Sequence, residues 1–281
     1  MPKAKSKDLL LRIQNRIGAI YDDRESASIA RNYLADRYNL TSIDLAMNQL
    51  VDVEEDQLET DLKRLEKKIP YQHIVGFSYF LNRKFFTNEH TLIPRPETEG
   101  LVDWVLKDAR KIDPIILDIG TGTGCIPISI KLELPNSDCT GVDISSEALT
   151  LAKSNAKALS ASVNFEHLDI LSADLDADSF DVVISNPPYI PLREKTTMHD
   201  NVVNHEPHVA LFVPDNDPLL FYRVIAEKSF NALKPEGKLY FEIHEAYGKD
   251  TCSLLKSIGY ADVIMQQDLQ GKDRMIRVSK P

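Results

Sequence analysis

The sequence predicts an α/β protein whose mostly parallel, seven-stranded sheet carries helices on both faces. Two apolar, β-branched runs give the clearest strand signals. The run Pro114–Leu117 leads into a glycine-rich turn and then a helix-like stretch, an order typical of parallel sheets. The run Phe180–Ser185 stops at two prolines, which cannot continue a ladder of backbone hydrogen bonds. Strands and helices alternate from about residue 90 to the end of the chain.

Further apolar stretches complete the predicted sheet. They are residues 138–142, 162–167, 238–243, 261–267 and 274–278. Helix-like segments separate most of these strands, as parallel pairing requires. The last two strands are close enough in sequence to pair directly, so we expect an antiparallel pair at the end of the sheet.

Residues 1–70 are predicted to form a small helical bundle. Two series of apolar residues repeat there at helical spacing: Leu10, Ile13, Ile17 and Ile20, and then Leu58, Leu62, Leu65 and Ile69. Between them, Thr41 and Asp44 have the spacing of a capping box. Residues 71–90 are rich in aromatic side chains and predict a β-hairpin connector to a second domain, residues 91–281.

The composition disfavours several classes of function. The formal net charge is −10, whereas proteins that hold nucleic acid by its phosphates use clustered Lys and Arg. No apolar run approaches the ~18 residues of a membrane-spanning helix. The three cysteines share no metal or redox spacing, and the histidines near residue 200 match no defined metal site. We therefore expect a cytoplasmic protein that binds no metal, does not enter a membrane and does not bind nucleic acid directly.

The glycine-rich turn after the first strand predicts a ligand site without a phosphate. In the dinucleotide-binding pattern G-x-G-x-x-G, the third glycine is one residue later than it is here. An aspartate also precedes this turn, and its carboxylate repels a phosphate but tolerates an ammonium group. The predicted cofactor-binding residues of the turn are Asp118, Gly120, Thr121, Gly122, Thr123 and Gly124.

Two later strand ends supply the remaining groups of such a site. Asp143 closes one strand and is placed to accept both hydroxyls of a ribose. Asp169 and Ile170 follow the next strand and can hold the edge and the face of an adenine. S-adenosylmethionine contains a ribose, an adenine and an ammonium group but no phosphate. It is therefore the expected cofactor, with S-adenosylhomocysteine as its product.

The motif Asn186-Pro187-Pro188-Tyr189 predicts a site for a planar amino group. The prolines restrict the backbone, so the Asn186 side chain and the Asn186 and Pro187 carbonyls are stiffly aimed. Two acceptors can take the two hydrogens of an amino group while Tyr189 packs on its plane. We predict Asn186, Pro187 and Tyr189 as catalytic residues and all four as substrate-binding, with Asn186 also near the cofactor. Taken alone, the motif is also compatible with a proline-rich loop around a satisfied asparagine.

These motifs, in this order, resemble those of the class I, Rossmann-like, S-adenosylmethionine-dependent methyltransferases. Further stretches narrow the resemblance to the release factor glutamine methyltransferases, the PrmC/HemK family. They are Tyr71–Gly76, Thr91–Glu99, Glu206–Leu211 and Asp268–Arg274. One segment departs from the family pattern, because Phe212–Pro218 replaces a glycine-rich stretch.

The resemblance implies methyl transfer to the side-chain amide nitrogen of the glutamine in the Gly-Gly-Gln motif of class I peptide chain release factors. It also implies that residues 1–70 dock this protein substrate. Arg95 is predicted either to form an ion pair in a turn or to close over the methionine end of the cofactor. Two other hypotheses remain open. A nucleic-acid amino methyltransferase predicts a basic groove or a base-reading domain, and a non-catalytic binding module predicts loss of the glycines or of Asn186.

Overall fold

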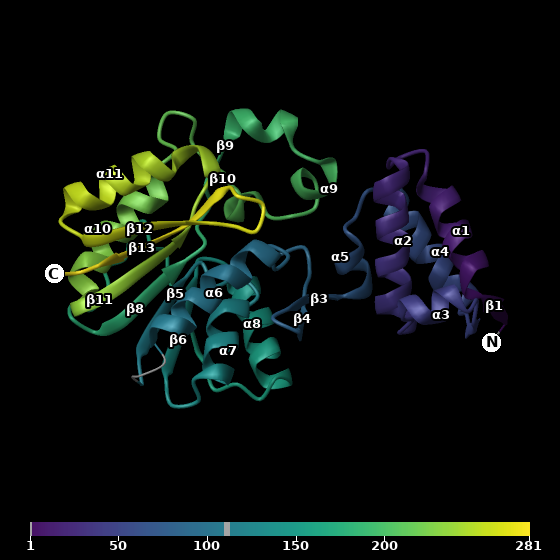
Figure 1. The fold of residues 1–281 in the computed structure, drawn as a ribbon, viewed down its shortest axis with the longest axis horizontal. Coiled ribbons are helices and arrows are strands. Elements are labelled where there is room, and N and C mark those ends of the chain that lie inside the picture. Colours follow the sequence, from purple (N-terminus) through teal and green to yellow (C-terminus); the bar gives the residue numbers. More distant parts are fainter. Residues whose placement is uncertain (1, 110–112) are drawn as a thin grey trace. The chain divides into compact units, whose positions relative to one another are not determined.

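The computed structural model describes residues 2–109 and 113–281, which form two compact units. The N-terminal unit contains the residues up to Phe77 together with His199–His205. The C-terminal unit contains Ser78–Met198 and Glu206–Pro281 (Figure 1). Within these described ranges, no helix combines the length and the apolar character that crossing a membrane requires.

The N-terminal unit is a helical bundle with a short antiparallel strand pair. Its helices are α1 (Ser6–Ile17), α2 (Asp23–Tyr38), α3 (Ser42–Ala46), α4 (Glu55–Glu66), α5 (Tyr71–Val75) and α9 (Asp200–Val203), and its strands are β1 (Lys3–Lys5) and β2 (Leu50–Asp52). Both predicted apolar series contribute to its core, although Ile20 follows the end of α1. The predicted capping box is confirmed, because Thr41 and Asp44 each accept a hydrogen bond from the other's backbone N–H.

The predicted hairpin connector over residues 71–90 is corrected at its beginning. Tyr71–Val75 forms helix α5, and its Ile74 is buried in the core of the N-terminal unit. Pro70 precedes this helix and Gly76 ends it in the left-handed conformation, which are usual helix boundaries. The two-stranded sheet is confined to β3 (Phe77–Phe80) and β4 (Arg83–Phe86).

The predicted sheet of the C-terminal unit is confirmed. Its strand order is β12-β13-β11-β8-β5-β6-β7, and only β13 runs antiparallel to its neighbours. The strands are β5 (Ile115–Ile119), β6 (Asp138–Asp143), β7 (Asn164–His167), β8 (Phe180–Ser185), β11 (Leu233–Glu242), β12 (Ala261–Gln267) and β13 (Asp273–Ser279). A short parallel pair, β9 (Ile190–Pro191) and β10 (Phe212–Val213), lies outside this sheet.

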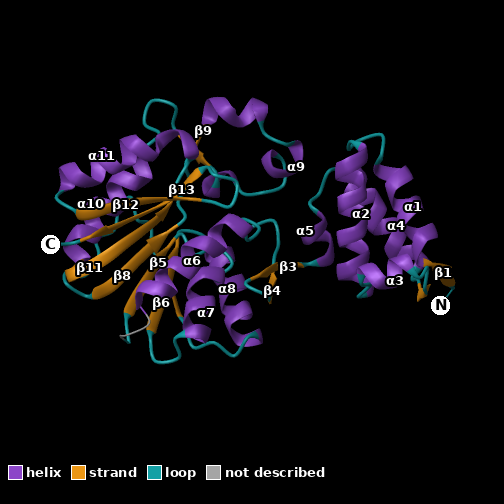
Figure 2. Ribbon diagram, in the orientation of Figure 1, coloured by secondary structure: helices purple, strands orange, loops and turns teal. Residues whose placement is uncertain are grey.

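Helices cover both faces of the sheet (Figure 2). One face carries α6 (Pro96–Ala109), α7 (Cys125–Glu133) and α8 (Ser146–Ala158), and the other carries α10 (Leu220–Ala232) and α11 (Gly248–Ile258). Successive residues of a strand point to opposite faces, so Val182 joins the first core cluster and Val183 the second. Short 3-10 turns occupy Leu192–Thr197, His208–Ala210 and Glu245–Tyr247.

The register of the parallel strands aligns their carboxyl ends. Ser185, the last residue of β8, pairs with Ile119 of β5 on one side and with Phe241 of β11 on the other. Ile119 in turn pairs with Val142 of β6. The residues that follow these strands therefore emerge at the same edge of the sheet, which is where ligands bind in open α/β sheets.

Candidate active site

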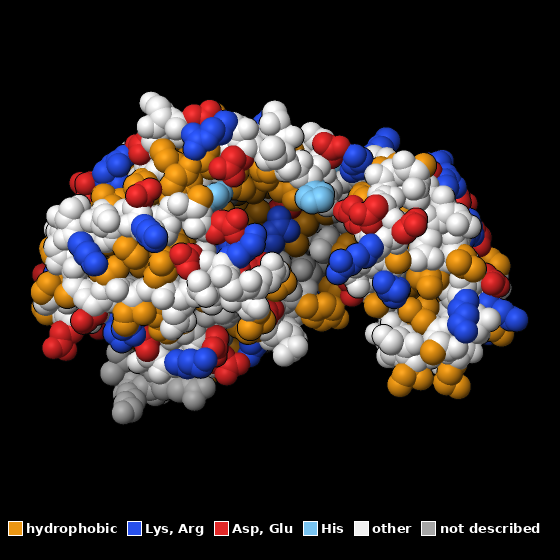
Figure 3. Space-filling view, turned by 45° about the horizontal axis from the view of Figure 1, so that its top comes forward, with side chains coloured by type: hydrophobic (Ala, Val, Ile, Leu, Met, Phe, Trp, Pro, Cys, Tyr) orange, Lys and Arg blue, Asp and Glu red, His pale blue; other side chains and the backbone are white. Residues whose placement is uncertain are grey.

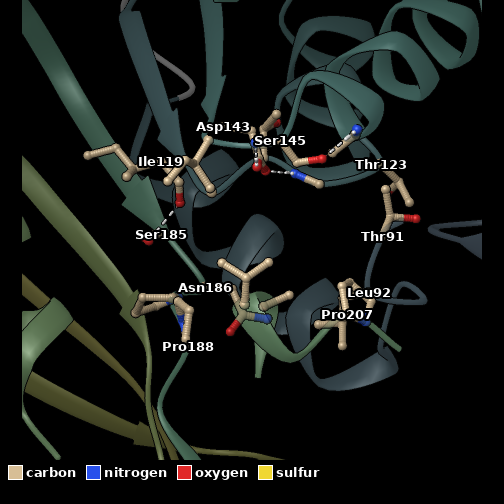
Figure 4. Close-up of a pocket in the computed structure, with 18 of the residues that line it drawn as sticks. Thr91, Leu92, Ile119, Thr123, Asp143, Ser145, Ser185, Asn186, Pro188 and Pro207 are labelled. Carbon is tan, nitrogen blue, oxygen red and sulfur yellow. Dashed lines mark hydrogen bonds between the residues drawn. The ribbon is translucent and has the colours of Figure 1, made fainter. Parts of the chain in front are cut away.

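A pocket lies at the carboxyl edge of the sheet, within the C-terminal unit. The loops after β5, β6, β7 and β8 contribute to its wall, as do two segments outside the sheet. Its polar and glycine-turn lining includes Gly120, Thr121, Gly122, Thr123, Asp143, Asp169, Asn186 and Pro187. Figure 4 shows Asp143 and Asn186 on facing walls of this pocket. The structure therefore brings together residues that the sequence placed after four different strands.

The glycine-rich turn exposes its backbone to the pocket. Gly120, Gly122 and Gly124 all have positive φ, at 77°, 54° and 77°. The Gly122 N–H donates to Asp143 Oδ2 at 2.8 Å, so the turn is held against the end of β6. At Gly124, an added Cβ would lie 2.9 Å from Ile128 Cδ1, and a side chain would also be strained by the positive φ. Gly124 itself does not line the pocket but starts helix α7 behind it.

Asp143 retains acceptor capacity toward the pocket. Its Oδ1 accepts from the Ser145 N–H at 2.9 Å and its Oδ2 accepts from Gly122. A carboxylate offers about four lone-pair sites, so Asp143 keeps capacity to accept a further hydrogen bond. Burial raises the pKa of Asp143, while the backbone hydrogen bonds from Ser145 and Gly122 oppose this rise.

Asp169 and Ile170 line the pocket beside the end of β7. The Leu171 N–H donates to Asp169 Oδ1 at 2.9 Å and the Ser172 hydroxyl donates to Oδ2 at 3.0 Å. Ile170 is buried and belongs to the second core cluster of the sheet. The acid and the apolar side chain thus lie together in the lining of the pocket, and their role in holding an adenine stays a prediction.

Asp118 lies behind the pocket rather than in its lining. It is fully buried within β5, and neither of its carboxyl oxygens has a hydrogen-bond partner among the described residues. Burial raises its pKa to about 7; the nearby Thr121 hydroxyl opposes the rise and the charge of Asp143 adds to it. Direct contact between Asp118 and a ligand therefore stays a prediction.

The motif after β8 is divided between the pocket and the core. Asn186, Pro187 and Pro188 line the pocket, whereas Tyr189 does not. Its ring packs against the second core cluster and lies edge-on to His244, with the ring centroids 5.9 Å apart. The Tyr189 hydroxyl donates to Glu242 Oε1 at 3.1 Å. The predicted packing of Tyr189 on a substrate plane consequently stays a prediction.

One wall of the pocket comes from two segments that are distant in sequence, Thr91–Arg95 and Pro207–Ala210. Glu206 joins them, because its buried carboxylate accepts from the Ile93 N–H at 3.1 Å and from Arg95 Nη2 at 2.6 Å. Of the two predicted roles for Arg95, the structure shows the ion pair. The structural role of Glu206 was not predicted from the sequence, although the residue lies in the family-like stretch Glu206–Leu211.

The hydrogen-bond partners of Thr98 and Glu242 beside the site were also not predicted from the sequence. The Asn186 Nδ2 group donates to Thr98 Oγ1 at 3.3 Å, and the Thr98 hydroxyl donates to Glu242 Oε2 at 2.6 Å. The signal for Glu242 was an acidic residue at the end of a buried strand that borders the site. Nothing in the local pattern around Thr98 indicates its partner.

The surface charges are mixed. On the face drawn in Figure 3, Lys and Arg side chains are interspersed with Asp and Glu over both units. Among the residues described, no group of three or more His, Cys, Asp or Glu side chains is placed to hold a metal ion.

The unpartnered Asp118 predicts a pH dependence of stability. Its pKa of about 7 in the folded state exceeds the ordinary value of 3.8, so the folded state binds the proton more tightly. As pH rises from 4 to 7, the unfolded chain ionises first and the free energy of unfolding falls. Between pH 5 and pH 8, wild-type protein should lose roughly 2–3 kcal/mol relative to Asp118→Asn.

Urea unfolding followed by the fluorescence of Trp104 measures this effect. Trp104 is the single tryptophan of the chain and is buried in the core of the C-terminal unit. Asp138→Asn, at an exposed position of the same sheet, is the control. A stability difference between wild type and Asp118→Asn that does not change with pH would contradict the unpartnered state of this carboxyl.

Comparison with known proteins identifies the family. The family model described as a methyltransferase domain matches residues 113–275. A curated relative from Flavobacterium psychrophilum, named release factor glutamine methyltransferase, is 41% identical over 94% of this chain and 95% of its own length. A relative of the same name from Bacteroides thetaiotaomicron is 42% identical over 95% of this chain and 98% of its own length.

A solved methyltransferase structure from Pyrococcus furiosus covers 78% of this chain and 98% of its own, with a TM-score of 0.53 and 16% identity. At that identity it shows the shared fold alone. The sequence relatives extend over nearly the whole chain and confirm the resemblance that the motifs indicated. The chain therefore belongs to the release factor glutamine methyltransferase family.

Proposed function

We propose that this enzyme transfers a methyl group from S-adenosylmethionine to the side-chain amide nitrogen of a glutamine, the one in the Gly-Gly-Gln motif of class I peptide chain release factors. The observation that carries the proposal is the shared pocket of Asp143 and Asn186. Asp143 and the glycine-rich turn form one wall, and Asn186 with Pro187 forms the facing wall. A cofactor site and an acceptor site for an amino group are thus adjacent.

The pocket fits S-adenosylmethionine, which supplies an electrophilic methyl group when it is bound. Asp143 would hold the ribose hydroxyls, because its carboxylate lines the pocket and keeps acceptor capacity. Asp169 and Ile170 would hold the adenine, and the backbone from Gly120 to Thr123 would border the amino-acid end. Asp143 would serve a ribose of NAD as well, so the preference over NAD comes from the glycine-rich turn, whose third glycine is one residue earlier than in the dinucleotide-binding pattern.

Asn186 and Pro187 would orient the glutamine amide. An amide nitrogen is a poor nucleophile, because its lone pair is delocalised into the carbonyl group. The Asn186 Oδ1 atom and the Pro187 carbonyl would accept its two hydrogens and aim the nitrogen at the methyl group. Such fixed geometry can supply ~7 kcal/mol or more of the barrier reduction. In the reaction the nitrogen would gain a bond to the methyl carbon as that carbon separates from the sulfonium sulfur, and it would release one proton to solvent, which leaves a neutral N-methyl amide and a neutral thioether.

Several features favour a protein substrate. The net charge is −10, and on the face drawn in Figure 3 the Lys and Arg side chains are interspersed with Asp and Glu. Binding to the phosphate backbone of a nucleic acid uses clustered Lys and Arg instead. The N-terminal unit offers exposed apolar side chains, with Ile43 69%, Met47 70% and Leu50 64% exposed. We therefore assign the docking of the folded release factor to this unit, and we place the reaction in the cytoplasm, where release factors act.

Cofactor recognition is tested at Asp143. Asp143→Ala removes the acceptor of the ribose hydroxyls, and each charge-assisted hydrogen bond contributes about 1.5–3 kcal/mol at most. The Kd for S-adenosylhomocysteine, measured by calorimetric titration, should rise tenfold or more. Unchanged affinity, or tighter binding of NAD than of S-adenosylmethionine to the wild-type protein, would refute this cofactor site.

Mass spectrometry of a class I release factor tests the reaction itself. After incubation with this protein and isotope-labelled S-adenosylmethionine, the label should be found on the glutamine of the Gly-Gly-Gln motif. Asn186→Ala should lose most turnover while its cofactor Kd stays within roughly tenfold and its Tm within a few degrees. Label in DNA and none in the factor would overturn the substrate assignment, and near-normal turnover of the variant would make Asn186 structural.

Docking is tested by comparing the folded factor with a short Gly-Gly-Gln peptide. We expect much higher kcat/KM on the factor, because only the factor can also contact the N-terminal unit. The double variant Ile43→Glu, Met47→Glu should raise KM for the factor and leave the kinetics on the peptide unchanged. The peptide is thus the internal control. Equal efficiency on both substrates would argue against any docking surface outside the pocket.

A further inference from the structure

A buried row of polar groups continues from Asn186 into the protein. The Asn186 Nδ2 group donates to Thr98 Oγ1 at 3.3 Å, and the Thr98 hydroxyl donates to Glu242 Oε2 at 2.6 Å. The second carboxylate oxygen of Glu242 accepts from the Tyr189 hydroxyl at 3.1 Å. This row joins helix α6, the loop after β8 and the end of β11.

Glu242 occupies a position where a carboxylate is costly. It is 1% exposed, and it lies beside the motif after β8 because Phe241 pairs with Ser185. Burial is the largest cause of a raised pKa of Glu242, and the charge of Glu97 adds to the rise, while hydrogen bonds from Thr98 and Tyr189 and the positive charge of Arg274 oppose it. Each of its two oxygens nevertheless accepts from a hydroxyl group, from Thr98 at 2.6 Å and from Tyr189 at 3.1 Å, and this is the hydrogen-bonding pattern of a carboxylate.

The ionised carboxylate determines the direction of every hydrogen bond in the row, that is, which group donates and which accepts. A carboxylate only accepts hydrogen bonds, so the single hydroxyl proton of Thr98 must point to Glu242. The Thr98 oxygen then has only lone pairs to offer to Asn186. The Asn186 atom that contacts Thr98 must consequently be the amide nitrogen, and the side-chain oxygen is the atom left for another partner.

We propose that Glu242, acting through Thr98, holds the Asn186 side chain with its oxygen available to the substrate, so that Glu242 and Thr98 are positioning residues for the glutamine amide. This inference rests on the proposed function, because the orientation matters only for a substrate group that donates hydrogens. The Tyr189 hydroxyl completes the same row by occupying the second oxygen of Glu242.

A substitution that removes this fixed direction of the hydrogen bonds should impair turnover while the pocket keeps its shape. When position 242 carries a group that can also donate, the Thr98 hydroxyl can turn and donate to Asn186. The asparagine amide can then reverse and present its NH2 group to the NH2 group of the substrate. Two donors facing each other form no hydrogen bond, and one neutral hydrogen bond corresponds to a factor of roughly ten in rate.

Kinetics on the folded release factor test the proposal with isosteric variants. We expect Glu242→Gln and Thr98→Val each to lower kcat roughly tenfold. KM for the factor and Kd for S-adenosylhomocysteine should stay within about twofold. The double variant should fall no further than either single variant, because both substitutions interrupt one row.

Two further variants separate positioning from stability. Thr98→Ser keeps the hydroxyl and should retain near wild-type kcat. Thr251→Val is a matched control, because Thr251 is a fully buried threonine whose hydroxyl donates only to the Tyr247 carbonyl of its own chain segment. Additive losses in the double variant, failure of Thr98→Ser to preserve kcat, or an equal loss in Thr251→Val would overturn the positioning role.

A neutron crystal structure of the wild-type protein tests the orientation without any substrate. The proposal predicts deuterium on Thr98 Oγ1 directed at Glu242 and the Asn186 amide deuterons directed at Thr98. A proton on Glu242 directed at Thr98, or a reversed Asn186 amide, would overturn the proposal. This result does not depend on which protein is methylated, whereas an inactive wild-type enzyme with the predicted proton positions would reject the proposed function alone.

Discussion

The register of the parallel sheet is the constraint on which the site depends. Ser185 pairs with both Ile119 and Phe241, so the glycine-rich turn, the asparagine motif and Glu242 emerge next to one another. A slip of one residue in any of these strands would also exchange the side chains between the two faces of the sheet. The two core clusters, which alternate along β5, β8 and β11, hold the register in place. Packing on both faces of the sheet therefore fixes the relative positions of the site residues at its carboxyl edge.

One half-buried and one buried carboxylate hold the walls of the pocket at this edge. Asp143 anchors the glycine-rich turn through the Gly122 N–H, and Glu206 joins two distant segments of the pocket wall through Ile93 and Arg95. Burying a charge is costly unless donors satisfy it. Both carboxylates meet this requirement with backbone N–H groups or a guanidinium group. The same groups that satisfy the buried charges thus also hold the walls of the pocket in one arrangement.

The sequence alone was sufficient to predict those features of the structure that depend on patterns of neighbouring residues. Strand runs, positive-φ glycines and paired prolines act over a few residues, so the sheet, the glycine-rich turn and the location of Asn186 and Pro187 at the pocket could all be predicted. Hydrogen-bond partners that lie far apart in the sequence could not be predicted. Thr98 and Glu242 are separated by 144 positions, and Arg95 and Glu206 by 111. One sequence does not show which acid meets which donor, so the hydrogen bond between the Tyr189 hydroxyl and Glu242 was not predicted.

The central claim is that Asn186 presents an acceptor to a glutamine amide beside the cofactor. A crystal structure of this protein with S-adenosylhomocysteine and a Gly-Gly-Gln peptide tests it most directly. The account predicts the glutamine nitrogen within hydrogen-bonding distance of the Asn186 side chain and the Pro187 carbonyl, and facing the cofactor sulfur, while the other terminal atom of Asn186 stays on Thr98. A glutamine bound elsewhere, or an Asn186 side chain that turns away from the amide, would contradict it.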